Sequence, residues 1–209
     1  QQIFGAFERA GGSLGSQSGR NSFNFTASVL SSELADTLPI FADVVLNPSF
    51  PADELEKLRE RALASIARVD DRLGSSASRF FFRNYFGDHP YGNLAQGTVE
   101  SVKRLSADDL AAFHDRFVVA PNGVLAIFGD IDLDATEALV RKLFGQMEAA
   151  PAFKLPDMPA PKPPAEDRTA VQPFKQTEAA QVDFGFPGVK FTSEDFYPLT
   201  MLDTMISGY

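Results

Sequence analysis

Few residues of this chain are of the types that carry chemistry, and their spacing limits what they can do. The sequence has two histidines, His89 and His114, and no cysteine. A zinc site needs three protein ligands, usually with two of them close in sequence or on one helix face. The two histidines belong to no His-x-x-Glu-His or comparable pairing. We therefore expect His89 to shape a loop before Pro90 and His114 to lie on a surface helix.

Other reactive patterns are weaker. No Gly-x-Ser-x-Gly elbow is present for a serine nucleophile, although counting residues leaves a Ser-His-Asp arrangement open. The glycine-rich run 11–15 precedes a predicted strand, whereas a phosphate cradle needs the amides of a helix N-terminus. Arg20 beside Asn21 is typical of a solvated turn, and Asp130 with Asp132 is typical of a turn and a helix cap. The residue patterns alone thus predict no catalytic residue.

Composition narrows the class of partner. The formal net charge is −9, which argues against nucleic acid because phosphate neutralisation needs clustered Lys and Arg. No apolar run approaches the roughly 18 residues of a membrane-spanning helix, so we expect no membrane insertion. The absence of cysteine excludes disulfides and is compatible with any redox environment. No signal peptide is visible and residue 1 is not Met, so these features leave the compartment open.

Hydrophobic periodicity predicts the elements that must position any site. Residues 1–10 are typical of a helix end that Gly11 and Gly12 stop. A hairpin should follow, with strands at 13–20 and 22–30. A continuous apolar run predicts a buried strand at 124–128, and alternation predicts another strand at 180–186. Helices are predicted at 32–46, 54–73, 76–86, 98–104, 107–117, 134–144 and 193–206, with capping boxes at Thr98-x-x-Ser101 and Ser106-x-x-Asp109.

The predicted helix at 54–73 has the most regular pattern. Acidic residues crowd its first turn, where they meet the positive end of the helix dipole. Its apolar residues recur at steps of three and four and therefore share a face: Leu55, Leu58, Ala62, Ile66, Val69 and Leu73. Leu58 and Ser65 stand seven residues apart, which places them two turns apart on almost the same line.

Proline content predicts the domain organisation. Six prolines between residues 149 and 168 are typical of an extended, semi-rigid linker. The linker would separate an α+β domain at 1–148, with its N-terminal part missing, from the start of a second α+β domain at 169–209. One strand and one helix cannot form an independent core, so we expect truncation or a disordered remainder after them.

Several segments, in order over nearly the whole chain, resemble the insulinase and pitrilysin-type zinc metallopeptidases, which include the mitochondrial processing peptidases. The segments are GGSLGSQSGR, FADVVLNPSFPADELEKLRERAL, FFRNYFGDHPYGNLAQGTVESVKRLSADDLAAFHDRFVVAPNGVLAIFGDID, and VDFGFPGV followed by DFYPLTMLDTMI. The resemblance implies an α+β, two-layer domain with an antiparallel-rich sheet covered by helices, plus the start of a second similar domain. It also implies two halves that close like a clamshell around a peptide.

The resemblance further implies where zinc would be held. In the family, one half carries His-x-x-Glu-His, whose histidines bind zinc while the glutamate activates water, and a later helix supplies a third ligand. The motif would lie before residue 1 or at the very start of the chain, and these residues do not supply it. The third ligand falls on Ser65, and a companion acid falls on Leu58. The resemblance therefore implies no metal and no cofactor in this chain, with zinc in a catalytic half or partner.

A peptide-binding edge is the other implication of the resemblance. In the catalytic half, a substrate peptide adds as a strand beside the segment that matches residues 14–18. Here that segment is Leu14, Gly15, Ser16, Gln17 and Ser18. A blunted edge strand that avoids aggregation accounts equally well for its small polar residues.

We therefore expect a bacterial-type, metal-free domain that completes a peptide-binding chamber for a zinc-bearing half or subunit of the same family. Alone it should be inactive, and its acidic balance would favour basic or unfolded peptides. Two alternatives stay open. The chain could be part of an active zinc metalloendopeptidase whose motif precedes residue 1, or a structural assembly subunit without peptidase activity.

Overall fold

The computed structural model describes residues 2–93, 95–147, 149–160, 170–171 and 178–207. The chain divides into two compact units. The first comprises Gln1–Ile66 and Ala95–Asp157, and the second comprises Ala67–Leu94 and Met158–Tyr209. The division at 1–148, 149–168 and 169–209 stays a prediction, and residues 161–168 of the predicted linker lie outside the described residues.

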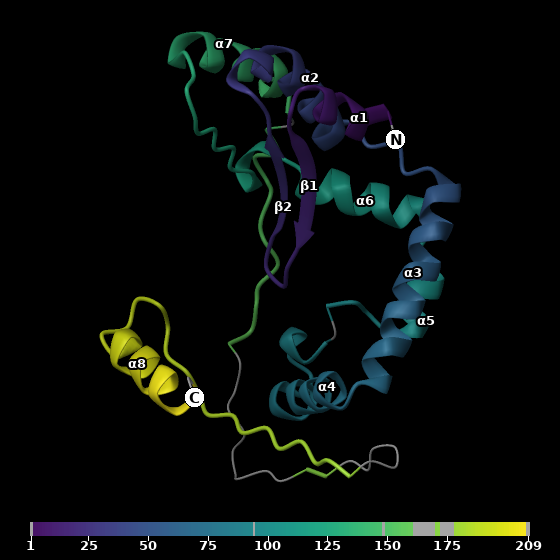
Figure 1. Ribbon diagram of the computed structural model, residues 1–209, viewed down its shortest axis with the longest axis vertical. Coiled ribbons are helices and arrows are strands. Elements are labelled where there is room, and N and C mark those ends of the chain that lie inside the picture. The colour runs from purple at the N-terminus through teal and green to yellow at the C-terminus, as the bar shows by residue number, and fades with distance from the viewer. Residues whose placement is uncertain (1, 94, 148, 161–169, 172–177, 208–209) are drawn as a thin grey trace. The chain divides into compact units, whose positions relative to one another are not determined.

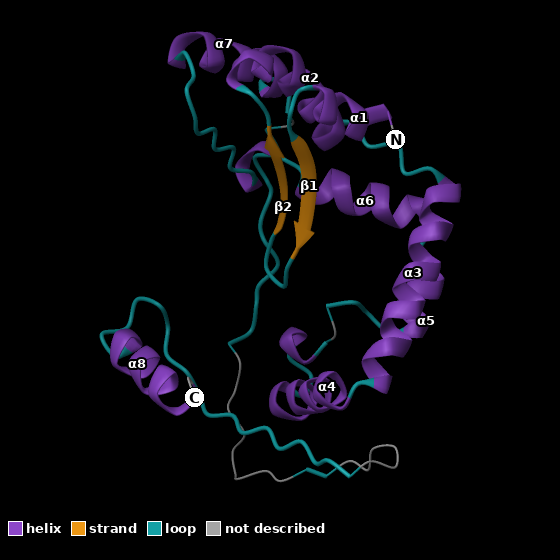
Figure 2. Ribbon diagram, in the orientation of Figure 1, coloured by secondary structure: helices purple, strands orange, loops and turns teal. Residues whose placement is uncertain are grey.

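Helices dominate the chain, and one small antiparallel sheet is present among the described residues (Figures 1 and 2). This arrangement confirms the α+β class. The elements are α1 (Gln2–Arg9), β1 (Ser13–Ser18), β2 (Phe23–Ser28), α2 (Leu34–Leu46), α3 (Ala52–Asp71), α4 (Leu73–Phe86), α5 (Val99–Arg104), α6 (Ala107–Phe117), α7 (Leu133–Phe144) and α8 (Phe196–Ser207). Each predicted helix and the predicted hairpin therefore has a counterpart, with ends that differ by a few residues.

A glycine pair ends α1 and starts the hairpin, as predicted. Gly11 has a φ of 66°, a backbone conformation that residues other than glycine rarely adopt. Its N–H donates to the Glu8 carbonyl at 3.1 Å, and the Gly12 N–H donates to the Phe7 carbonyl at 2.8 Å. These two bonds satisfy carbonyls that the helix end would otherwise leave without partners.

The core of the first unit lies where α1, α2 and α7 gather at one end of the hairpin (Figure 1). Phe7, Leu38 and Phe41 form a buried cluster, and only 1% of Phe7 is exposed. Partly buried apolar residues pack against this cluster: Leu14, Val29, Leu34, Ile40, Val45, Ile127, Leu139, Val140, Leu143 and Phe144. The inward positions of β1, α2 and α7 thus share one hydrophobic core.

His114 lies on α6, a helix with many exposed residues as predicted, but its own side chain is half-buried and reaches α2. Its side chain is 17% exposed, and its Nε2 lies 2.8 Å from the Val45 carbonyl oxygen. Val45 belongs to the last turn of α2, whose carbonyls have no partner within the helix. The imidazole therefore caps α2 from α6, a contact between residues far apart in sequence.

The strands predicted at 124–128 and 180–186 are wrong. Both segments lack a strand partner among the described residues, where β1 and β2 form the one sheet. Val124 is 98% exposed and Phe128 is 91% exposed, and Phe184 is exposed as well. An apolar run becomes a buried strand only where neighbouring strands and a facing layer cover it. Among the described residues no strand lies beside either segment, although Ile127 packs against the core cluster.

In the second unit, aromatic rings link α4 to the turn that follows it. Phe86 contacts Tyr91 at a centroid distance of 5.6 Å, and Phe81 stacks on Tyr85 at 5.4 Å. His89 shapes this turn, as predicted, because its Nδ1 accepts a hydrogen bond from the Tyr91 N–H at 3.1 Å. Its Nε2 lies 2.8 Å from the Pro159 carbonyl oxygen.

Candidate functional site

The helix α3 carries the two positions that the family resemblance aligns with zinc-binding acids. It begins after Pro51, with Asp53 and Glu54 in its first turn. Ile66 is its buried anchor, at 5% exposure. The continuous helix places Leu58 and Ser65 on nearly one line, since seven residues turn through about 700°.

The surroundings of the two positions differ. Leu58 is 57% exposed, and Ser65 is half-buried. The prediction that Leu58 lies on the packed face is wrong, because eight residues separate it from Ile66 and place it about 80° around the helix from that anchor. Leu58 therefore sits at the margin of the apolar stripe, where no other element covers most of its side chain.

Neither side chain suits a zinc donor set. Zinc in proteins is bound by Cys, His, Asp and Glu, whereas leucine has no donor atom and the serine hydroxyl is neutral. Across the ranges that the structure describes, no three His, Cys, Asp or Glu side chains gather into a group that could hold a metal ion. These residues do not fit zinc, and no reaction step can be assigned to them.

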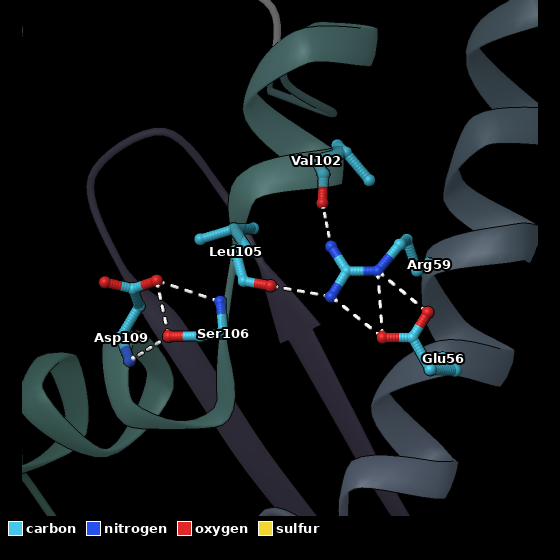
Figure 3. A network of polar contacts seen from close by, with 6 residues as sticks. All are labelled: Glu56, Arg59, Val102, Leu105, Ser106 and Asp109. Carbon is cyan, nitrogen blue, oxygen red and sulfur yellow. Dashed lines mark hydrogen bonds and ion pairs between the residues drawn. The ribbon is translucent and has the colours of Figure 1, made fainter.

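A half-buried arginine fixes α3 beside α5 (Figure 3). The Arg59 side chain is 14% exposed and donates to the carbonyl oxygens of Val102 and Leu105, the latter at 2.6 Å. It also pairs with the Glu56 carboxylate at 3.1 Å. Both carbonyls lie at the C-terminal end of α5, where helical partners are lacking. Arg59 thus satisfies the end of one helix from the side of another.

The sequence pattern does not identify Arg59 as a residue that anchors another helix. Glu56, Lys57 and Glu60 nearby on α3 are charged and exposed, and the spacing of Arg59 from Glu56 predicts only a surface ion pair. Its main partners are backbone carbonyls more than 40 residues away. No local signal specifies such partners, so the anchor becomes visible only in the fold.

The next helix begins with the second predicted capping box (Figure 3). The Ser106 hydroxyl accepts from the Asp109 N–H at 3.1 Å, and the Asp109 carboxylate accepts from the Ser106 N–H at 2.8 Å. Hydrogen bonds from the Ser106 hydroxyl and then its backbone lower the pKa of Asp109. The box at Thr98 and Ser101 is also formed, so both predicted boxes are confirmed. Together with Arg59 they define the path of the chain from α5 into α6.

The predicted peptide-binding segment is β1, whose residues face solvent except for the half-buried Leu14. Its antiparallel register with β2 pairs Leu14 with Ala27 and Ser18 with Phe23. The hairpin closes with a bond from the Gly19 N–H to the Ser22 carbonyl at 2.8 Å. No strand pairs with β1 on the side away from β2 within the described ranges.

The register indicates which main-chain groups of β1 reach that open edge. Hydrogen-bonded and non-hydrogen-bonded pairs alternate in an antiparallel ladder. Gly19 and Ser22 form a hydrogen-bonded pair. Two and four residues back along β1, Gln17 and Gly15 should therefore also form hydrogen-bonded pairs with their partners in β2. The N–H and C=O groups of the alternate residues then point away from β2. These residues are Leu14, Ser16 and Ser18.

The structure is thus an α+β domain that has an open edge strand and carries Ser65 on α3. Residues 104–209 match the family model described as the peptidase M16 inactive domain, and residues 1–98 match that of insulinase, peptidase family M16. The chain belongs to peptidase family M16. Proteins of this family act on peptides and often pair two domains or subunits.

Curated relatives of this chain are named as zinc proteases. An uncharacterized zinc protease of Mycobacterium leprae is 36% identical over 140 residues, which are 67% of this chain and 32% of that protein. One from Streptomyces coelicolor is 26% identical over 212 residues, covering 99% of this chain and 46% of that protein. The chain thus spans about a third to a half of the length of these relatives. Their names connect the family with zinc.

Solved structures support the fold. The peptidase M16 inactive domain from Pseudomonas fluorescens is 26% identical, with a TM-score of 0.68 over 77% of this chain and 39% of that one. Pitrilysin has a TM-score of 0.65 at 18% identity, covers 77% of this chain and 17% of its own, and supports the fold alone. No helix among the described residues is long and apolar enough to cross a bilayer.

Proposed function

We propose that this chain is the non-catalytic half or subunit of an M16 peptidase, where it completes a peptide-binding chamber with a zinc-bearing half or partner. The observation that carries the proposal is the open edge of β1. Such an edge binds an extended peptide by adding it as a strand, mainly through main-chain hydrogen bonds. The match of residues 104–209 to an inactive-domain family model supports the non-catalytic role.

The proposed absence of zinc rests on α3. Ser65 and Leu58 stand at the positions that the resemblance assigns to acids, and neither is a zinc ligand of useful strength. Zinc would then be held entirely by the catalytic half or partner. The role left for this chain is to bind the peptide and close the chamber.

A proline at the centre of the open edge tests the proposed binding mode. Ser16→Pro removes a main-chain N–H that points away from β2 and should leave the β1–β2 bonds in place, since proline is tolerated on edge strands. We expect peptide affinity of the full-length protein to fall about tenfold, the equivalent of one charge-neutral hydrogen bond in a dry site. Fluorescence anisotropy with a labelled, unstructured peptide measures this change.

Ser16→Ala is the matched control, because it keeps the N–H and should bind like the unmodified protein. A second measurement leaves the protein unchanged and methylates alternate backbone nitrogens of the peptide. One set of methyl groups should abolish strand addition while the other should not. Equal binding by Ser16→Pro, Ser16→Ala and both methylated peptides would rule out the β1 edge as the binding site.

The proposed metal-free role predicts how substitutions in α3 affect the zinc content of the full-length protein. In the full-length protein, Ser65→Ala and Glu60→Gln should leave both the bound zinc and the peptidase rate unchanged, because α3 would hold no metal. Zinc is measured by mass spectrometry after dialysis. Loss of stoichiometric zinc in either variant would contradict the proposal and favour an active zinc peptidase whose motif precedes residue 1.

A further inference from the structure

The two faces of the β1–β2 hairpin have different chemistry. Directly opposed residues of an antiparallel pair share a face. One face therefore carries Leu14, Ser16 and Ser18 of β1, with three apolar residues of β2 beside them: Ala27, Phe25 and Phe23. The other face is polar or bare throughout: Ser13, Gly15 and Gln17 of β1, with Asn24, Thr26 and Ser28 of β2.

Aromatic residues of β2 stand opposite the two serines on the first face. The rings of Phe23 and Phe25 contact each other edge to face, at a centroid distance of 6.0 Å. Phe23 also contacts Phe113 of α6 at 5.9 Å. Phe25 and Phe113 are both exposed. The hairpin and α6 thus present aromatic surface to water on the face that carries the short side chains of Ser16 and Ser18.

We propose that β1 prefers extended peptides that carry large apolar side chains at alternate positions. This inference rests on the proposed function, since it assumes strand addition at the open edge. An added strand lies about 4.8 Å beyond β1 and directs every second side chain to the aromatic face. Between such a side chain and the rings of Phe25 and Phe23 stand only Ser16 and Ser18.

Because Ser16 and Ser18 have short side chains, they leave a low strip on that face between the added peptide and the rings, and we call this strip the serine step. A leucine, methionine or phenylalanine of the peptide is long enough to reach across the two serines toward the rings. The resulting contact removes apolar surface of both partners from water. An alanine or serine of the peptide leaves the rings exposed. The preference therefore depends on Ser16 and Ser18, whose side chains are short at positions where a larger side chain would itself cover the rings.

The opposite face sets no such requirement. A Cβ built on Gly15 has nothing within 4 Å, and the neighbouring side chains are polar. Peptide side chains that point to this face remain beside water and can be of any polar type. Recognition should consequently have a period of two, with one selective face and one permissive face.

Two peptides of equal composition and charge test the inference. In one, leucine alternates with lysine and threonine, and in the other the leucines are consecutive. The peptide is free to choose its register, so the alternating pattern can always direct all leucines to one face. We expect the full-length protein, with a zinc chelator present to stop turnover, to bind the alternating peptide about tenfold more tightly.

A variant that fills the step locates the preference. Ser16→Leu should reduce the ratio of the two affinities to about one, because the added side chain covers the rings itself. Gln17→Leu adds the same group on the polar face and should keep the ratio. A retained ratio in Ser16→Leu, or a lost ratio in Gln17→Leu, would overturn the role of the serine step.

The outcomes separate the inference from the proposed function. If the unmodified protein binds both peptides equally, and Ser16→Pro weakens both, β1 binds peptides without the preference and the inference fails alone. If neither peptide binds, strand addition at β1 fails and the inference fails with it.

Discussion

Replacing Gly12 by alanine is expected to lower the free energy of unfolding by about 3 kcal/mol or more, through a clash with the backbone. An ideal Cβ on Gly12 would lie 1.8 Å from the Ser28 carbonyl oxygen and 2.9 Å from the Val29 Cα. These atoms belong to the end of β2 and the residue after it, and they cannot move without breaking the register with β1. The N–H of Gly12 is also bonded to Phe7, which ties its position to the end of α1.

Gly15→Ala is the matched control for this change. It lies three residues further along the chain, inside β1, and an added Cβ meets no atom within 4 Å. Alanine there should be neutral or stabilising by about 0.5 kcal/mol, since it reduces the freedom of the unfolded chain. Urea unfolding followed by far-UV circular dichroism compares the two. Equal stabilities would show that the close approach of Gly12 to β2 is absent in solution.

Removing the guanidinium of Arg59 is the second large effect we expect. Arg59→Met keeps much of the apolar stem but leaves two carbonyls at the end of α5 without their donor. Hydrogen bonds from charged groups contribute about 1.5–3 kcal/mol each, and part of this is recovered when water reaches the freed carbonyls. A loss of about 2–3 kcal/mol should follow, with increased hydrogen exchange in α5.

A second charged residue of α3 provides the comparison. Lys57 also pairs with acids of its own helix, Glu54 at 2.7 Å and Asp53 at 3.5 Å, but its side chain is exposed. Lys57→Met should leave the unfolding transition almost unchanged, because exposed ion pairs contribute little. Hydrogen exchange in α5 that is as fast in Lys57→Met as in Arg59→Met would contradict the anchoring role of the guanidinium.

Local signals were sufficient for much of this fold. The capping boxes at Ser106 and Thr98 and the glycine stop after α1 depend on residues within a few positions of each other, and each is present in the structure. The strand predicted at 22–30 is likewise present as β2 (Phe23–Ser28). Such features follow from backbone geometry and short side chains, so the sequence alone specifies them.

Features that depend on distant partners were not predictable in the same way. Residues 124–128 have the composition of a buried strand, but composition does not specify which strand lies beside it. Arg59 has the sequence context of a surface residue, and His114 that of an exposed helix position. Each of these outcomes is decided by backbone groups of another element. The positions of Leu58 and Ser65 on one helix line were predictable because they depend on helix geometry alone.

The aromatic residues of the turn after α4 have an optical consequence. The chain has no tryptophan and four tyrosines, which stand at 85, 91, 197 and 209. All four fall within the second compact unit, and two of them belong to the ring contacts around Phe86. Intrinsic ultraviolet emission of this chain therefore comes almost entirely from one unit. The first unit is spectroscopically silent by this method, so one tryptophan placed there would report its unfolding without overlap.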